Sequence, residues 1–208
     1  MSLVIACGPF TTRWGGFFLS RVDFLIFSYE CSADLSYKPL DDLFHHLKTT
    51  RPDVLILCGP FADSSHRLLD PATIGTSGGF SNGNPPDSLE LIRRVVREHL
   101  IAGLKSIGGI KCVLIPNLLD LHCPCVYPQP PFDVEILLPG ADNLYEHSES
   151  LPMLLSNPCT FRINEVVVSI STSDILLHLS GNEASRISSD RLSRLARHVV
   201  EQVCLQIA

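Results

Sequence analysis

Short apolar runs recur along the chain, and polar or turn-forming stretches separate them. Runs of about four to eight apolar residues are typical of strands that are buried on both faces of a sheet. The first run ends in Gly8-Pro9-Phe10, and the second ends in the same three residue types, Gly59-Pro60-Phe61. The pattern predicts four strands: Leu3–Ala6, Val54–Leu57, Cys112–Ile115 and Val166–Ile170.

Apolar residues at helical spacing lie between the predicted strands. The stretch from Leu40 to Leu47 has apolar residues at the i, i+3, i+4 and i+7 positions of one helix face. Asp87 and Glu90 have the spacing of a capping box before a second helix. Two more helices are predicted, one capped by Thr172-Ser173-Asp174 and one with an apolar stripe over Leu192, Leu195, Val199 and Val203. Strands that alternate with helices predict an α/β domain whose sheet is covered on both faces.

Composition and charge limit the class of partner. The chain has 208 residues, 45% hydrophobic and 18% charged, which is enough apolar material for one folded domain. Its formal net charge is -6, whereas a protein that binds DNA on its own typically has a basic surface patch. The basic helix face of Arg93, Arg94 and Arg97 is interpreted as a solvated surface, with a patch for an acidic partner or DNA phosphates as the alternative. The sequence shows neither a membrane-spanning run nor a signal-peptide pattern, so no membrane association is expected.

Eight cysteines are distributed along the chain, several of them inside apolar runs. Without a secretory signal, this placement favours free thiols in a reducing compartment over disulfides. His122 and Cys123-Pro124-Cys125 form the one metal-like cluster in the sequence. One intervening residue is poor spacing for a zinc knuckle, and no second pair lies at a matching distance. We therefore expect no metal cofactor at this cluster.

The strand ends are the places to look for chemistry, because loops at the carboxyl edge of a parallel sheet carry the active sites of α/β proteins. Metallophosphoesterases build a two-metal site there from a bridging aspartate and later asparagine and histidine ligands. In this sequence Pro60, Leu118 and Leu119 stand where such ligands are needed. The polar residues that remain are Asp63, His66, Asp120 and His122. Hydrogen bonds to loop amides are their favoured role, and a lone metal site is the alternative.

The other candidates for chemistry are weaker. The sequence contains neither a phosphate-binding loop nor a G-x-S-x-G nucleophile motif. His45-His46 lies on the first predicted helix, where a solvated face is expected. His178 lies between leucines, and we expect a hydrogen-bonded, partly buried histidine there instead of a ligand.

A series of motifs resembles those of a known family, the B subunit of DNA polymerase alpha–primase. The two Gly-Pro-Phe strand ends resemble the wider B-subunit group of replicative polymerases. The runs Tyr127–Phe132 and Thr172–Leu179 resemble the alpha member of that group. The motifs that carry the resemblance are Gly8–Thr12, Ser36–Leu40, Arg51–Asp63, Ile115–His122, Val126–Phe132 and Ser171–Leu179. Together they span most of the chain.

The resemblance implies a degenerate calcineurin-like phosphoesterase sandwich that has lost its catalysis. It implies a non-catalytic accessory subunit, without a cofactor, that acts in the initiation of DNA replication in the nucleus. Its implied partners are the C-terminal domain of the polymerase catalytic subunit, primase through the complex, and DNA indirectly or weakly. A metal-dependent phosphoesterase or nuclease with a residual site is the alternative. The motif positions at the strand ends are Gly8, Pro9, Phe10, Gly59, Pro60, Phe61, Asp63, Asp120, His122, Tyr127, Pro128, Asp174 and His178.

The sequence departs from the family pattern in three ways. It begins at the first phosphoesterase strand and stops after the last predicted helix, so the single domain, 1–208, is expected to be incomplete at both ends. An open sheet edge then favours aggregation, and a product without a stable fold is a third hypothesis. Residues 13–31 form an additional segment, aromatic and without a clean helical or strand period, interpreted as translated intron or as a docking loop. Residues 71–87 are expected to form a flexible loop.

Overall fold

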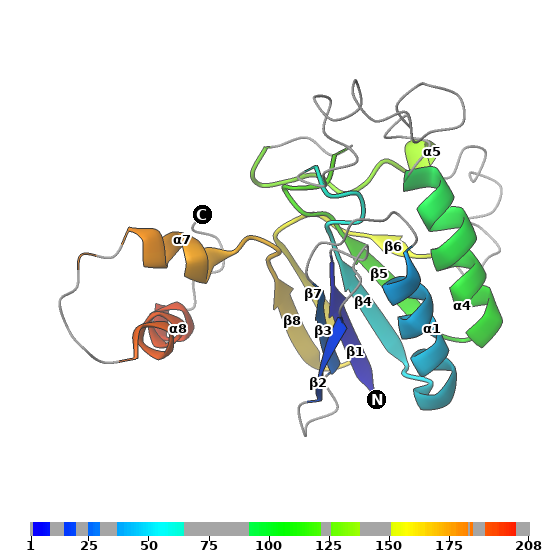
Figure 1. Cartoon of the computed structure of the whole chain (residues 1–208), viewed down its shortest axis with the longest axis horizontal. Helices are drawn as coiled ribbons and strands as arrows, with labels where there is room; N and C mark the ends of the chain where they lie inside the picture. The colour runs from blue at the N-terminus through cyan, green and yellow to red at the C-terminus, as the bar shows by residue number, and fades with distance from the viewer. Residues whose placement is uncertain are drawn as a thin grey trace.

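A six-stranded sheet lies at the centre of the molecule, in the order β2-β3-β1-β4-β5-β6 (Figure 1). The structure is a computed structural model, and it describes residues 2–8, 15–19, 25–29, 37–64, 92–121, 126–137, 151–182, 184 and 190–202. The strands of this sheet are β1 (Leu3–Cys7), β2 (Gly15–Leu19), β3 (Leu25–Tyr29), β4 (Val54–Cys58), β5 (Lys111–Ile115) and β6 (Met153–Leu154). The neighbours β1, β4, β5 and β6 run parallel, β3 lies parallel to β1, and β2 pairs with β3 antiparallel.

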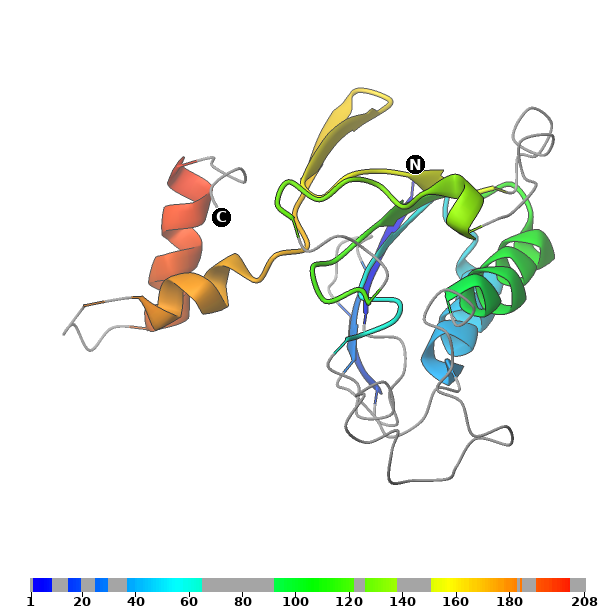
Figure 2. The ribbon, with the colours of Figure 1, turned by 90° about the horizontal axis from the view of Figure 1, so that it is seen from above.

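Helices cover one face of the sheet (Figure 2). Helix α1 (Lys38–Thr50) has Pro39 in its first turn, where the fixed φ and the missing N–H of proline suit a helix start. A second helix contains a π-helical segment, η1 (Val95–Ile101), and continues as α4 (Ala102–Ile107). The apolar stripes of these helices pack on one face of β1, β4 and β5, whose buried residues there are Val4, Ala6, Leu55, Leu57, Cys112 and Leu114.

Helices α1 and α4 approach each other closely at a glycine. A Cβ atom on Gly103 would overlap the ring of Phe44, which is itself buried. Because protein interiors are close-packed, a larger residue at this position would push the two helices apart. The helix layer ends at Gly108, whose φ of 68° lies in the region that glycine adopts most readily.

A two-stranded hairpin covers the opposite face of the sheet (Figure 2). It consists of β7 (Cys159–Ile163) and β8 (Val166–Ile170), which pair antiparallel. Alternate side chains of the hairpin, including Phe161 and Val168, pack on the buried face of the sheet, which contains Leu3, Val54, Ile56, Cys58, Val113 and Ile115. The sheet is therefore covered on both faces, by helices on one and by strands on the other.

Helices α7 (Ile175–Gly181) and α8 (Arg191–Gln202) pack on each other beside the sheet, while the short helix α5 (Val134–Leu137) lies near the helix layer (Figure 1). No residue of α7 is buried, and Leu177 on α7 is 68% exposed. Val200 on α8 is 75% exposed, so the pair presents apolar side chains on the surface. Among the helices that the structure describes, none combines the length and apolar character of a membrane span.

Most of the predicted elements are confirmed. The four predicted strands correspond to β1, β4, β5 and β8, and the predicted helices correspond to α1, the η1–α4 helix, α7 and α8. Arg94, directly before η1, and Arg97 within it are exposed, whereas Arg93, the third residue of the predicted basic face, is half-buried. Of the predicted apolar stripe on α8, Leu195 is buried, whereas Leu192 is 61% exposed. Strand β7 was not among the predicted continuous apolar runs, although its alternation of apolar and polar residues is itself the pattern of a half-buried strand.

Residues 13–31, whose sequence shows no clean helical or strand period, contain two strands of the sheet. Strands β2 and β3 lie in this segment, and β3 extends the sheet beyond β1. A free sheet edge pairs with the backbone of any extended segment, so a strand forms there without a period-two pattern. The intron interpretation stays a prediction, which sequencing of transcripts across Thr12–Asp34 tests. The predicted loop 71–87 lies outside the described residues, as do Pro9, Phe10 and His122.

Candidate functional site

The carboxyl ends of β1, β4 and β5 meet at one edge of the sheet. The residues after these strands and the segment after β8 enclose a cleft of about 580 Å³, which we call the strand-end cleft. It is lined by Ile5, Cys7, Gly8, Cys58, Gly59, Pro60, Asp63, Asn117, Leu119, Ser169, Ile170, Ser171, Thr172 and Asp174. Five of the predicted motif positions thus lie together: Gly8, Gly59, Pro60, Asp63 and Asp174.

Two glycines allow the strand ends to approach closely. A Cβ atom on Gly8 would overlap the carbonyl oxygen of Pro60, and one on Gly59 would overlap the carboxylate of Asp120. The N–H of Gly8 also donates to the carbonyl oxygen of Cys58 at 2.8 Å, which continues the β1–β4 pairing into the cleft. The absence of a side chain, more than backbone freedom, explains glycine at both positions.

Asp120 lies beneath the cleft with 2% of its surface exposed. Its Oδ1 accepts the N–H of Phe61 at 2.6 Å and that of Ala62 at 3.1 Å, and its Oδ2 accepts the N–H of Asn117 at 2.9 Å. Burial raises the pKa of Asp120 to about 7, although the three hydrogen bonds act in the opposite direction, and the charge of Asp63 adds to the rise. Asp120 therefore fixes the turn after β4 to the turn after β5, which is the amide-binding role favoured from the sequence.

Asp63 is a second buried carboxyl group next to Asp120. It is 4% exposed, and its backbone forms an antiparallel bridge with that of Asp120. The pairing continues beside the bridge, where the N–H of Ser64 donates to the carbonyl oxygen of Leu119 at 2.8 Å. Asp63 lines the strand-end cleft, whereas the carboxyl group of Asp120 holds the turns together.

Four polar residues form a hydrogen-bonded ring beside the cleft. Gln129 and Asn157 are fully buried, and each backbone N–H donates to the carbonyl oxygen of the other residue, at 2.7 and 2.9 Å. The side-chain NH₂ of Asn157 also donates to Oε1 of Gln129 at 3.2 Å. The side chain of Gln129 donates to the backbone carbonyl oxygen of Asn117 at 3.0 Å. The side chain of Asn117 in turn donates to the backbone carbonyl oxygen of Thr172 at 2.8 Å. The N–H of Thr172 donates to Oδ1 of Asn157 at 3.0 Å and closes the ring. This amide ring joins the turn after β5 to the residues before β7 and after β8.

Tyr37 and Phe61 connect the helix layer to the turn after β4. The hydroxyl of Tyr37 donates to the carbonyl oxygen of Phe61 at 2.8 Å, and burial raises the pKa of Tyr37 above its usual range. The ring of Phe61 meets that of Phe132 edge to face, with the centroids 5.7 Å apart. Three motifs that are separate in the sequence therefore converge on Phe61.

The remaining predicted positions lie nearer the surface. Tyr127 is half-buried and Pro128 is exposed. Asp174 caps α7, because its Oδ1 accepts the N–H of Leu177 at 3.0 Å. His178 is exposed, so the expectation of a partly buried histidine is wrong; α7 packs none of its residues into a core.

The described residues that line the strand-end cleft do not form a set of metal ligands. Within the described ranges, no three histidine, cysteine, aspartate or glutamate side chains are grouped as a metal centre requires. Pro60 and Leu119 line the cleft, and neither side chain has an atom that binds a metal. His66 and His122, the two histidines predicted near this site, lie outside the described residues.

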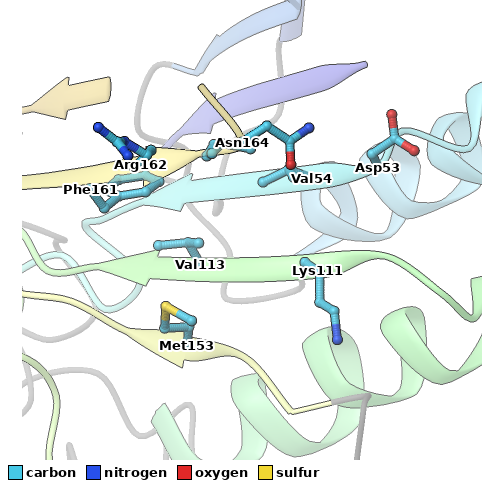
Figure 3. A pocket seen from close by; sticks show the side chains of 9 residues that line it. Asp53, Val54, Lys111, Val113, Met153, Phe161, Arg162 and Asn164 are labelled. Carbon is cyan, nitrogen blue, oxygen red and sulfur yellow. The ribbon is translucent and has the colours of Figure 1, made fainter. Parts of the chain in front are cut away.

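A second hollow, of about 650 Å³, lies at the opposite end of the strands, between the sheet and the tip of the hairpin (Figure 3). Apolar side chains, including Val113 and Phe161, form part of its wall, and the charged residues Asp53, Lys111 and Arg162 also line it. A hydrogen bond from the N–H of Ser2, at 2.6 Å, lowers the pKa of Asp53. This hollow lies at the amino ends of β4 and β5, whereas α/β sheets carry their chemistry at the carboxyl ends.

The amide ring was not predicted from the sequence. Gln129 was assigned to a motif without a role, Thr172 was predicted only as part of a helix cap, and Asn157 was not singled out at all. Asn157 precedes a proline in a short polar stretch, and this context is the same as that of an ordinary turn. The ring joins residues that are up to 55 positions apart, so no local pattern marks it.

Comparisons with known proteins agree with the motif resemblance. The family of DNA polymerase alpha/epsilon B subunits matches residues 3–206. The B subunit of DNA polymerase alpha from Bos taurus is 31% identical over 202 residues, and the one from Schizosaccharomyces pombe is 33% identical over 206 residues. The alignments cover 96% and 97% of this chain but only 27% and 29% of those two proteins. The chain therefore spans little more than a quarter of the length of the curated relatives it matches.

Proposed function

The chain belongs to the family of DNA polymerase alpha/epsilon B subunits, and we propose that it acts as a non-catalytic accessory subunit of the DNA polymerase alpha–primase complex. One observation carries the proposal. Asp120, a carboxyl group at the strand ends, has its acceptor atoms occupied by the backbone amides of Phe61, Ala62 and Asn117.

The same contacts argue against catalysis at the strand-end cleft. A carboxylate that holds a catalytic metal must be ionised and must direct lone pairs at that metal. Asp120 directs them at three amides, and burial raises its pKa to about 7, which disfavours the ionised form below that pH. Pro60 and Leu119 add no ligand. The cleft is thus better suited to a rigid scaffold than to phosphoester hydrolysis.

We propose that the protein partner is the C-terminal domain of the polymerase alpha catalytic subunit, with primase held through the complex. The buried amide ring supports this role, because it fixes loops from four parts of the chain in one arrangement. The net charge of -6 favours protein contacts and only indirect or weak contact with DNA. Such a subunit acts in the nucleus, during the initiation of DNA replication.

A pull-down tests the proposed partner. The 208-residue chain carries an affinity tag and is mixed, in moderate salt, with the C-terminal domain of its own polymerase alpha catalytic subunit. We expect the two proteins to be recovered together. A cooperative thermal transition of the chain shows that it is folded, and a folded chain that does not retain the domain contradicts the proposal.

A phosphodiesterase assay tests the absence of catalysis. With manganese and an activated phosphodiester, we expect the chain to show no turnover above that of Asp120→Ala. The matched control is His45→Ala, which changes an exposed side chain away from the cleft. Manganese-dependent turnover that His45→Ala keeps and Asp120→Ala loses would show an enzyme instead of a scaffold.

A further inference from the structure

Two cysteines lie side by side at the ends of adjacent strands. Cys7 is the last residue of β1, Cys58 is the last residue of β4, and the two are register partners in the parallel pair. Adjacent strands lie about 4.8 Å apart, which is within the range of about 4.4–6.8 Å between the Cα atoms of a disulfide. Both residues belong to the cluster between the sheet and the hairpin, where Cys58 is 3% exposed and Cys7 is half-buried.

The two thiols are free and interact with each other. A hydrogen bond from the thiol of Cys58 lowers the pKa of Cys7, while this hydrogen bond and burial raise the pKa of Cys58. The thiolate is the nucleophilic form of cysteine, so Cys7 is the attacking group of the pair. Cys58 keeps its proton and is placed to react second.

The pair is open to small molecules from one side. Cys7 and Cys58 both line the strand-end cleft of about 580 Å³. The next residues along the two strands are Gly8 and Gly59, which have no side chain to cover the sulfur atoms. A cleft of this size admits a small neutral oxidant.

We propose that Cys7 and Cys58 form a peroxide-sensitive dithiol site, which a small two-electron oxidant converts into a disulfide. The Cys7 thiolate attacks one oxygen of hydrogen peroxide, the O–O bond breaks, and the hydroxide that leaves takes up a proton to become water. The sulfur of Cys58 then attacks the Cys7 sulfenic acid, the S–O bond breaks, and a second water leaves with the Cys58 proton. Two thiols and one peroxide thus give one disulfide and two waters.

The other described cysteines are less suited to this reaction. Cys112 is buried on the helix face of the sheet, and burial raises its pKa. Cys159 lies in the hairpin and packs against the same cluster as Cys58, but it belongs to a different sheet and burial also raises its pKa. A disulfide between Cys58 and Cys159 is therefore the competing product, and the experiment distinguishes it.

Peptide mapping tests the proposal on the 208-residue chain. The reduced protein is treated with a small molar excess of hydrogen peroxide, its remaining thiols are alkylated, and it is digested with trypsin. Cys7 and Cys58 are each the one cysteine in their tryptic peptides, residues 1–13 and 49–67. We expect these two peptides to be linked in most of the oxidised protein and to separate on reduction.

Two controls show whether the fold directs the pairing. Cys112→Ser is expected to leave the linked peptides unchanged, whereas Cys58→Ser removes them and leaves Cys7 as a sulfenic acid that dimedone traps. The urea-unfolded protein should link its cysteines without preference, which keeps the test decisive even if Cys58→Ser does not fold. A main link from Cys58 to Cys159, over-oxidation of Cys7 without a link, or equal pairing in the folded and unfolded chains would each overturn the proposal.

Discussion

The carboxylate of Asp120 accepts the backbone N–H of Phe61 at 2.6 Å, although the two residues are 59 positions apart in the sequence. This hydrogen bond joins the turn after β4 to the turn after β5. The backbone N–H groups of Ala62 and Asn117 donate two further hydrogen bonds to the same carboxylate. The arrangement gives Asp120 a structural role at the strand ends, where α/β sheets carry their chemistry. The first two predictions follow from this contact.

Replacing Asp120 by asparagine should destabilise the fold. The new side chain keeps an oxygen for the N–H of Phe61, but its NH₂ group faces the N–H of Asn117, which then loses its acceptor. We expect a loss of about 2 kcal/mol and a Tm lower by roughly 4–8 °C. Thermal unfolding followed by circular dichroism measures the change. Asp42→Asn, on the exposed side of α1, is the control, and equal Tm values for the two variants would disprove the role of Asp120.

The stability of the chain should depend on pH through Asp120. Burial raises its pKa to about 7, from 3.8 for an exposed aspartate. Between these values the folded state holds a proton that the unfolded chain releases, so the free energy of unfolding falls as the pH rises from about 4 to about 7. The slope is at most about 1.4 kcal/mol per pH unit. Urea unfolding across this range measures it; parallel curves for the wild type and Asp120→Asn would contradict the assignment.

The amide ring predicts that a substitution of Asn157, which lies outside every motif, lowers the free energy of unfolding substantially. Asn157→Leu keeps the approximate size of the side chain but removes the partner of the Gln129 side chain and of the Thr172 N–H. One buried and one half-buried polar group without partners should cost about 2–4 kcal/mol. Asn182→Leu, at an exposed position after α7, should change the free energy of unfolding by less than about 0.5 kcal/mol. Chemical denaturation of both variants decides whether the ring is important for stability.

Gly59→Ala should disturb the strand-end cleft more than its small size suggests. The added methyl group would overlap the carboxylate of Asp120, so either the turn or the carboxylate must move, at a cost of about 1–3 kcal/mol. Gly181→Ala is the matched control, because its Cβ atom would meet nothing within 4 Å. Differential scanning fluorimetry should show a lower Tm for the first variant alone. A Tm for Gly59→Ala at or above that of the wild type would mean that the close approach is not required.

Four of the eight described strands and most of the described helices could be predicted, because their residues carry the signal themselves. The continuous apolar run of Val54–Cys58 identifies a central strand, and the spacing from Leu40 to Leu47 identifies α1. The ring around Asn157 depends on contacts between distant segments, which no local pattern encodes. Strand β3, which pairs with the edge of β1, was missed although it contains the apolar run Leu25–Phe27, because residues 13–31 as a whole show no clean strand period. Asp120 was found, but its three amide partners appear only in the structure.

The proposed role of this chain is that of a scaffold for the polymerase catalytic subunit. Size-exclusion chromatography with light scattering tests this role on a mixture of the chain and the C-terminal domain of the polymerase alpha catalytic subunit. We expect one peak with the mass of a one-to-one complex. Two separate peaks, from a chain that unfolds cooperatively and is therefore folded, would contradict the proposed role.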